Sequence, residues 1–201
     1  MLQPPFRVAL PVLGIERHNG ARTLRMKYKI PAANSTKHHG SLLNVAFRDA
    51  CTELHNRLTT LIAISPAFAS SVKRKMTIPN LDLEIQAFLY TAFILAMDNS
   101  EAMVDIDAIR NEFLNYDPFP EELKTIMIER SQEYIAIRKT ILDRGLDLHW
   151  LGEVFGTHIL HAEDDAIIEL SIDRFEQMHH LVGQYLADID SKSDSRSGPL
   201  K

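Results

Sequence analysis

The chain has 201 residues, of which 45% are hydrophobic and 24% are charged, an ordinary composition for one globular domain. Its single cysteine, Cys51, excludes an intramolecular disulfide and a cysteine-based zinc knuckle, and its apolar neighbours at helical spacing favour a packed thiol. Residues 85–97 are uncharged, but this stretch is shorter than the roughly 20 residues that cross a bilayer. We therefore expect a single domain over residues 1–190, in the cytoplasm and without membrane insertion.

Charge is unevenly distributed, although the net charge is only −5. Residues 1–79 hold twelve Lys or Arg and three Asp or Glu, a formal charge of +9. Residues 80–201 hold ten Lys or Arg and twenty-four Asp or Glu, a formal charge of −14. A basic half suggests an anionic partner. Alternatively, the two halves attract each other within one fold or between subunits.

Residues 6–30 are predicted to form a β-hairpin. Asn19-Gly20 suits the positive φ angles of a two-residue hairpin turn, and apolar and β-branched residues flank it. Because side chains alternate across a strand, one face is apolar and the other carries a row of basic side chains. This row and a second basic cluster in the loop at residues 73–75 form the predicted partner-binding surface: Arg22, Arg25, Lys27, Lys29, Lys73, Arg74 and Lys75.

From residue 41 onward, apolar residues recur at helical spacing and predict a helical body over residues 41–190. A long amphipathic helix starts at Ser41 and ends near Ser65. An apolar helix then runs to about Asp98, with Asn80 as its N-cap. Ser100 is the predicted cap of a third helix, which the turn at residues 117–120 stops.

The fourth helix is predicted to start at Pro120, to bury Leu123 in its core stripe and to end at Gly145. Residues 146–165 are apolar and predicted to be buried, with a short helix broken near Gly152 or Gly156. A last long helix carries core residues from Ile168 to Ile189, and residues 191–201 form a disordered tail. The predicted architecture is therefore mainly α, a helical bundle of five to six helices with an N-terminal β-hairpin.

Histidines and carboxylates near the C-terminus are the candidates for metal binding. His158, His161, His179 and His180 could hold zinc, iron or manganese together with nearby Asp and Glu side chains. A di-iron bundle, however, needs two Glu-x-x-His pairs, and only Glu176 and His179 have that spacing. We predict no metal and no cofactor.

Three arginines precede a histidine by five to seven positions: Arg174 before His179 and His180 on the last predicted helix, Arg48 before His55 on the first, and Arg144 before His149. This spacing resembles the Arg-x4–6-His arrangement of the helical HEPN ribonucleases. The resemblance implies that one such arginine and its histidine act on a phosphodiester within a dimer.

Phosphate-binding and hydrolase motifs of the forms GxxxxGK[ST], GxGxxG and GxSxG are missing from the sequence, which disfavours NTPases, dinucleotide enzymes and common hydrolases. We predict a non-catalytic interaction subunit or adaptor in a multiprotein assembly, whose basic hairpin and loop contact an acidic protein partner or another copy of the chain. An accessory nucleic-acid-binding protein is the first alternative, because the same side chains could contact phosphates. A helical metal-dependent enzyme or a HEPN-like ribonuclease ranks behind both.

Overall fold

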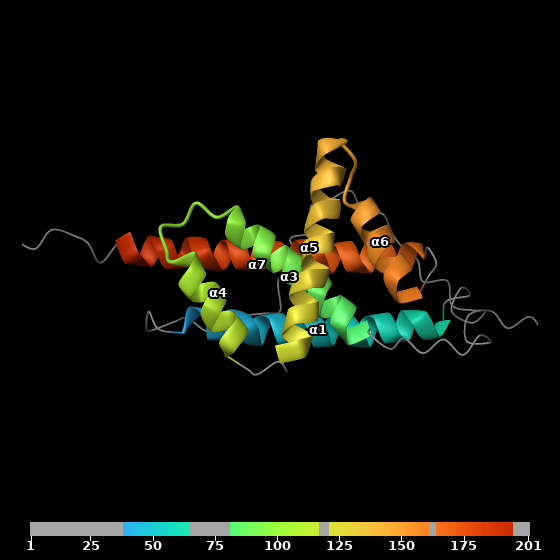
Figure 1. Ribbon diagram of the computed structural model, residues 1–201, viewed down its shortest axis with the longest axis horizontal. Helices are drawn as coiled ribbons and strands as arrows, with labels where there is room; N and C mark the ends of the chain where they lie inside the picture. The colour runs from blue at the N-terminus through green and yellow to red at the C-terminus, as the bar shows by residue number, and fades with distance from the viewer. Residues whose placement is uncertain (1–37, 65–80, 117–120, 161–163, 195–201) are drawn as a thin grey trace, which may run out of the picture.

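A computed structural model describes residues 38–64, 81–116, 121–160 and 164–194, and within these ranges the chain forms six helices and no strand (Figure 1). The helices are α1 (His39–Ile64), α3 (Leu81–Asp98), α4 (Ile106–Asn115), α5 (Glu121–Asp143), α6 (His149–Leu160) and α7 (Asp165–Asp194). The prediction of a mainly helical bundle is confirmed. The predicted hairpin and the basic loop lie outside the described residues. None of the described helices is both long enough and apolar enough to span a membrane.

Helix α3 lies at the centre of the body, where it packs against α1, α5, α6 and α7. It is apolar on nearly all sides, which is typical of a helix surrounded by protein. On one side, Phe93 stacks on Phe113 of α4 with ring centroids 4.1 Å apart. On another side, Phe88 stacks on Phe155 of α6 with ring centroids 4.4 Å apart. The core therefore continues on both sides of α3.

The two long helices α1 and α7 extend along the length of the molecule, and α5 crosses them with its C-terminal half projecting beyond the bundle (Figure 1). The predicted core stripe of the first helix is buried at Leu43, Phe47 and Leu54. On α5, Met127 is buried as predicted, but Leu123 is 42% exposed. The prediction for Leu123 was therefore wrong, because the buried face of α5 includes Met127 but does not extend to Leu123.

Two other helix predictions need correction. Asp105, not Ser100, caps the third helix, since the Asp105 carboxylate accepts a hydrogen bond of 2.9 Å from the amide of Ala108. Helix α6 is not broken at its glycines. A Cβ on Gly152 would lie 2.9 Å from side-chain atoms of Ile168 and Ile172, so this glycine permits close packing of α6 on α7.

The ends of the fourth and last helices follow simple local chemistry. Gly145 ends α5 as predicted, with a φ of 64° that favours glycine. Asp164 caps α7 through its carboxylate, which accepts from the amide of Ile167 at 3.3 Å. Helix α7 continues to Asp194, four residues into the segment predicted as a tail.

Candidate functional site

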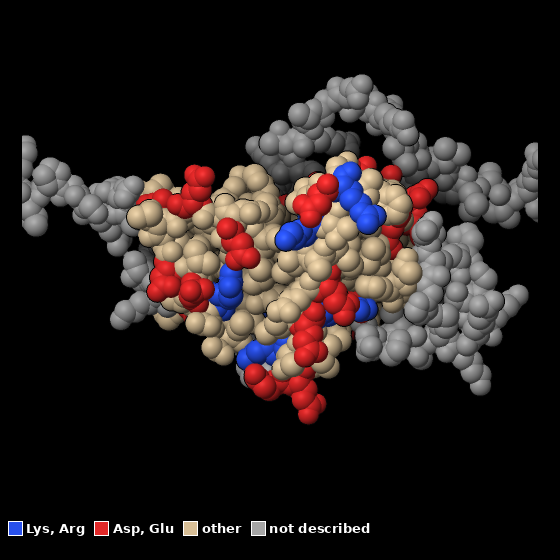
Figure 2. All heavy atoms as spheres, turned by 45° about the horizontal axis from the view of Figure 1, so that its top comes forward, with Lys and Arg blue, Asp and Glu red and all other residues tan. Residues whose placement is uncertain are grey.

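The described residues form an acidic body. They contain 24 Asp or Glu and 10 Lys or Arg, a formal net charge of −14. Figure 2 shows Asp and Glu side chains at several separate places on the face in view, with Lys and Arg side chains near them. The seven basic residues predicted to bind a partner, Arg22, Arg25, Lys27, Lys29, Lys73, Arg74 and Lys75, all lie outside the described residues. The candidate sites below therefore come from the helices.

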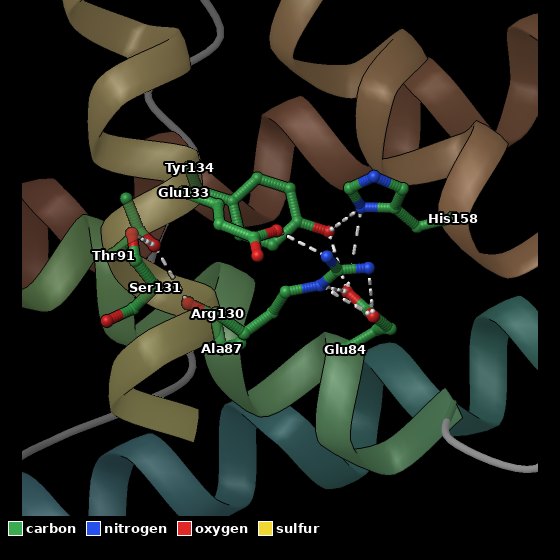
Figure 3. A network of polar contacts seen from close by, with 8 residues as sticks. All are labelled: Glu84, Ala87, Thr91, Arg130, Ser131, Glu133, Tyr134 and His158. Atoms are coloured by element: carbon green, nitrogen blue, oxygen red, sulfur yellow. Dashed lines mark hydrogen bonds and ion pairs between the residues drawn. The ribbon is translucent and has the colours of Figure 1, made fainter. Parts of the chain in front are cut away.

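A polar cluster joins α3, α5 and α6 around Glu84, a buried residue in the first turn of α3 (Figure 3). Arg130 donates to Glu84 Oε1 from Nε at 2.9 Å, and its Nη2 lies 2.8 Å from the same oxygen. The hydroxyl of Tyr134 donates to Glu84 Oε2 at 2.8 Å, and Nδ1 of His158 lies 2.9 Å from the Tyr134 oxygen. Arg130 also pairs with Glu133. The cluster thus connects three helices through one carboxylate.

The electrostatics of this cluster keep two of its members, Arg130 and Tyr134, protonated. Hydrogen bonding to Glu84 raises the pKa of Arg130, so the guanidinium stays charged. Burial and the charge of Glu84 raise the pKa of Tyr134, so the phenol keeps its proton and acts as a donor. Tyr134 is fully buried. These features suit a clamp that holds α5 and α6 on α3 better than they suit proton exchange with a substrate.

The structure describes only some of the residues predicted for a metal or nuclease site. His161 and Glu163 lie outside the described residues, and within the described ranges no three His, Cys, Asp or Glu side chains gather as a metal-binding group. Arg174 is 8% exposed, and its Nη2 lies 2.7 Å from Glu53 Oε1 on α1. Its guanidinium is therefore engaged between two helices.

A groove of about 330 Å³ lies between α1 and α3, and Cys51, the only cysteine of the sequence, is one of the residues that line it. Burial raises the pKa of the Cys51 thiol far above its ordinary range, and the charge of Asp82 raises it further. His55 pairs with Asp82 through Nδ1 and Oδ1 at 2.6 Å. Because a nucleophilic cysteine needs a lowered pKa, the environment agrees with a packed thiol.

An apolar groove of about 350 Å³ lies between the end of α5 and the start of α6. Its lining consists of Ala136, Ile137, Thr140, Ile141, Arg144, Leu146, Trp150 and Val154. Trp150 is 50% exposed and Leu146 38% exposed, and the adjacent Leu142 is 59% exposed. Arg144 is the single charged residue among the lining residues. This is a concave surface with an aromatic anchor and one cation.

The turn at Gly145 builds this groove. The amide of Gly145 donates to the carbonyl of Leu142 at 3.0 Å, and the amide of Leu146 donates to the carbonyl of Ile141 at 3.0 Å. This is the Schellman arrangement, which reverses the chain after a helix. It brings Leu146 and then α6 back against α5, while the Glu84 cluster holds both helices on α3.

The sequence reasoning missed this groove, because it predicted residues 146–165 to be buried. The exposure of Trp150 and Leu146 corrects that prediction. The available signal was the only tryptophan of the chain, located five positions after the helix terminator Gly145. No family model matches the sequence, and comparisons with curated proteins and with solved structures gave no match.

Proposed function

We propose that the protein is a non-catalytic interaction subunit of a protein assembly, and that the α5–α6 groove is one of its docking surfaces. The observation that supports this most directly is the half-exposed Trp150 in an apolar groove. Tryptophan is enriched among the residues that dominate binding energy at protein interfaces. Arginine is also enriched there, and Arg144 lines the same groove.

The basic side chains of residues 22–29 and 73–75 are the second contact surface in this proposal, and their partner is an acidic protein. The charge of the helical body supports this pairing, because a second copy would offer a surface of formal charge −14. Nucleic acid remains the alternative partner for these side chains, and the experiment below separates the two.

The test is purification of the native protein from cells at low salt, with nuclease-treated and untreated samples in parallel. We expect a nuclease-resistant protein complex of fixed stoichiometry. Trp150→Ala should weaken that complex, whereas Tyr116→Ala, which removes another aromatic side chain of similar exposure (52%), should not. Loss of the bound material on nuclease treatment would instead assign the protein to the nucleic-acid-binding class.

The basic surface is tested by charge reversal. Replacing Arg25, Lys27 and Lys29 with Glu should abolish binding without unfolding the helices, as followed by circular dichroism. The control reverses the same number of charges elsewhere, at Arg57, Lys139 and Lys201. Unchanged binding by the folded Arg25/Lys27/Lys29 variant would refute the role of the hairpin segment.

A further inference from the structure

We propose that the α5–α6 groove receives the acidic link between α3 and α4 of a second copy of this chain. The inference rests on the proposed function, because it names the partner of a docking surface assigned there. We call residues 101–105 of that link the acidic knob. Its centre is Met103, which Glu101 and Asp105 flank on the two sides.

The acidic knob presents an apolar side chain on an anchored backbone. Met103 is 91% exposed, the highest value among the large exposed hydrophobic side chains of the described residues. Its amide nevertheless donates to Asp190 Oδ1 of α7 at 2.9 Å, and the amide of Ala102 donates to Ser100 Oγ at 3.2 Å. Ala102 and Val104, the neighbours of Met103, pack against the core. Because the backbone is already held, docking of Met103 loses little backbone entropy.

The groove and the acidic knob are complementary in polarity and in charge. An unbranched methionine adapts to an irregular apolar groove, and its sulfur makes favourable contacts with aromatic rings such as that of Trp150. Arg144 is cationic, and no acidic residue lines the groove. Glu101 and Asp105 supply the opposite charge beside Met103. An acidic body that repels its own copies can therefore still associate at this point.

The two surfaces cannot meet within one molecule. Figure 1 shows the α3–α4 link at one end of the body and the turn between α5 and α6 at the projecting end of α5, away from it. A contact between them joins different surfaces of two copies, which is a heterologous contact. The pair of copies then keeps one unused groove and one unused knob, so assembly continues to a closed ring or an open chain.

The experiment uses two complementary variants of the full chain, followed by sedimentation velocity at low salt over a range of protein concentrations. Trp150→Ala removes the groove anchor and keeps the knob, whereas Met103→Asp removes the knob and keeps the groove. We expect the wild type to self-associate, and each variant alone to associate on the order of a hundredfold more weakly. Mixed together, the two variants should form a one-to-one heterodimer that does not grow further, because only one intact groove and one intact knob remain.

Charge and folding controls complete the design. Arg144→Glu should weaken self-association, and addition of Glu101→Lys to the same chain should restore it. Tyr116→Ala should assemble like the wild type, and circular dichroism should show native helix content in every variant.

Three results would overturn the inference: a wild type that stays monomeric at all concentrations, single variants that associate like the wild type, or a mixture that forms no heterodimer. Retained dimerisation by Met103→Asp alone would indicate a symmetric groove-to-groove contact and would equally refute the knob. If the wild type stays monomeric but captures another protein in a Trp150-dependent manner, this inference fails while the proposed function stands.

Discussion

Gly40 provides a direct test of how α1 and α4 pack. A Cβ at this position would lie 2.4 Å from the carbonyl oxygen of Ile109 and 2.5 Å from the amide nitrogen of Phe113. Both atoms belong to the backbone of α4, so they cannot move aside as a flexible side chain would. Gly40→Ala must therefore push α4 away from the start of α1.

The magnitude follows from two opposing effects. Alanine is a better helix former than glycine by about 1 kcal/mol. Overpacking against fixed atoms costs roughly 1–3 kcal/mol, and backbone neighbours place Gly40 near the upper end of that range. The displacement would also stretch the hydrogen bonds from the Gly40 amide (3.1 Å) and the Ser41 hydroxyl (2.6 Å) to Glu112. We expect Gly40→Ala to lower the free energy of unfolding by about 2 kcal/mol.

Gly183 is the matched control, because a Cβ on this residue of α7 would meet no atom within 4 Å. Gly183→Ala should raise the free energy of unfolding by up to about 1 kcal/mol. Urea denaturation followed by circular dichroism measures both variants against the wild type. The same substitution should therefore shift stability in opposite directions at the two sites. A Gly40→Ala variant as stable as the wild type would refute the close contact between α1 and α4.

Three further substitutions test the polar interactions. Glu84→Gln removes the carboxylate that Arg130 binds and should lower the free energy of unfolding, measured by urea denaturation, by about 2–3 kcal/mol. This loss is smaller than for a fully buried ion pair because Arg130 is 28% exposed. A loss under about 0.5 kcal/mol would contradict the role of the Glu84 cluster as a clamp. Burial alone would raise the pKa of Glu112, but hydrogen bonds from the Ser41 hydroxyl and the first amides of α1 lower it overall. The Glu112 carboxylate therefore adds stability above its unfolded pKa of about 4.3, and this contribution is lost as the pH falls through the lower folded value. Urea titrations at about pH 6 and about pH 3 give the stability that each protein loses between these two pH values. This loss should be smaller for Glu112→Gln than for the wild type, and equal losses would refute the stabilising role of the Glu112 carboxylate. Burial and nearby positive charge lower the pKa of His179, so protonation of this histidine opposes folding as the pH falls below about 6.5. His179→Gln should therefore reduce the stability that the protein loses between about pH 7.5 and about pH 5.5. An unchanged pH dependence of stability would contradict this role of His179.

Helix positions were predictable where one pattern dominates a long segment. The stripe that includes Leu43, Phe47 and Leu54 predicted α1, and the continuous apolar stretch before Asp98 predicted α3. Gly145 marked the end of α5 because glycine readily adopts the left-handed conformation that commonly ends a helix, whatever the rest of the fold. These signals are local, so the sequence contains them.

Contacts between helices were not predictable in the same way. Glu84 looked like an ordinary acidic residue in a first helical turn, and its partner Arg130 lies 46 positions away. Ser100 and Asp105 are both residue types that favour an N-cap, and the structure uses Asp105. Gly152 looked like a helix breaker because the sequence does not show that α7 passes beside it.

The error at residues 146–165 differs from the errors at single helix positions. The apolar composition of this segment predicted burial, and the prediction failed only at particular side chains. An apolar pattern shows that side chains avoid water, but it does not distinguish burial within one chain from burial against another. Within this segment, Phe155 and Ile159 are buried in the core, whereas Trp150 and Leu146 face the groove. The exposed large apolar side chains of this segment, Leu146 and Trp150, thus line the same groove. Scattered exposure needs no explanation, but a contiguous apolar groove with a tryptophan is a surface that a partner would bury.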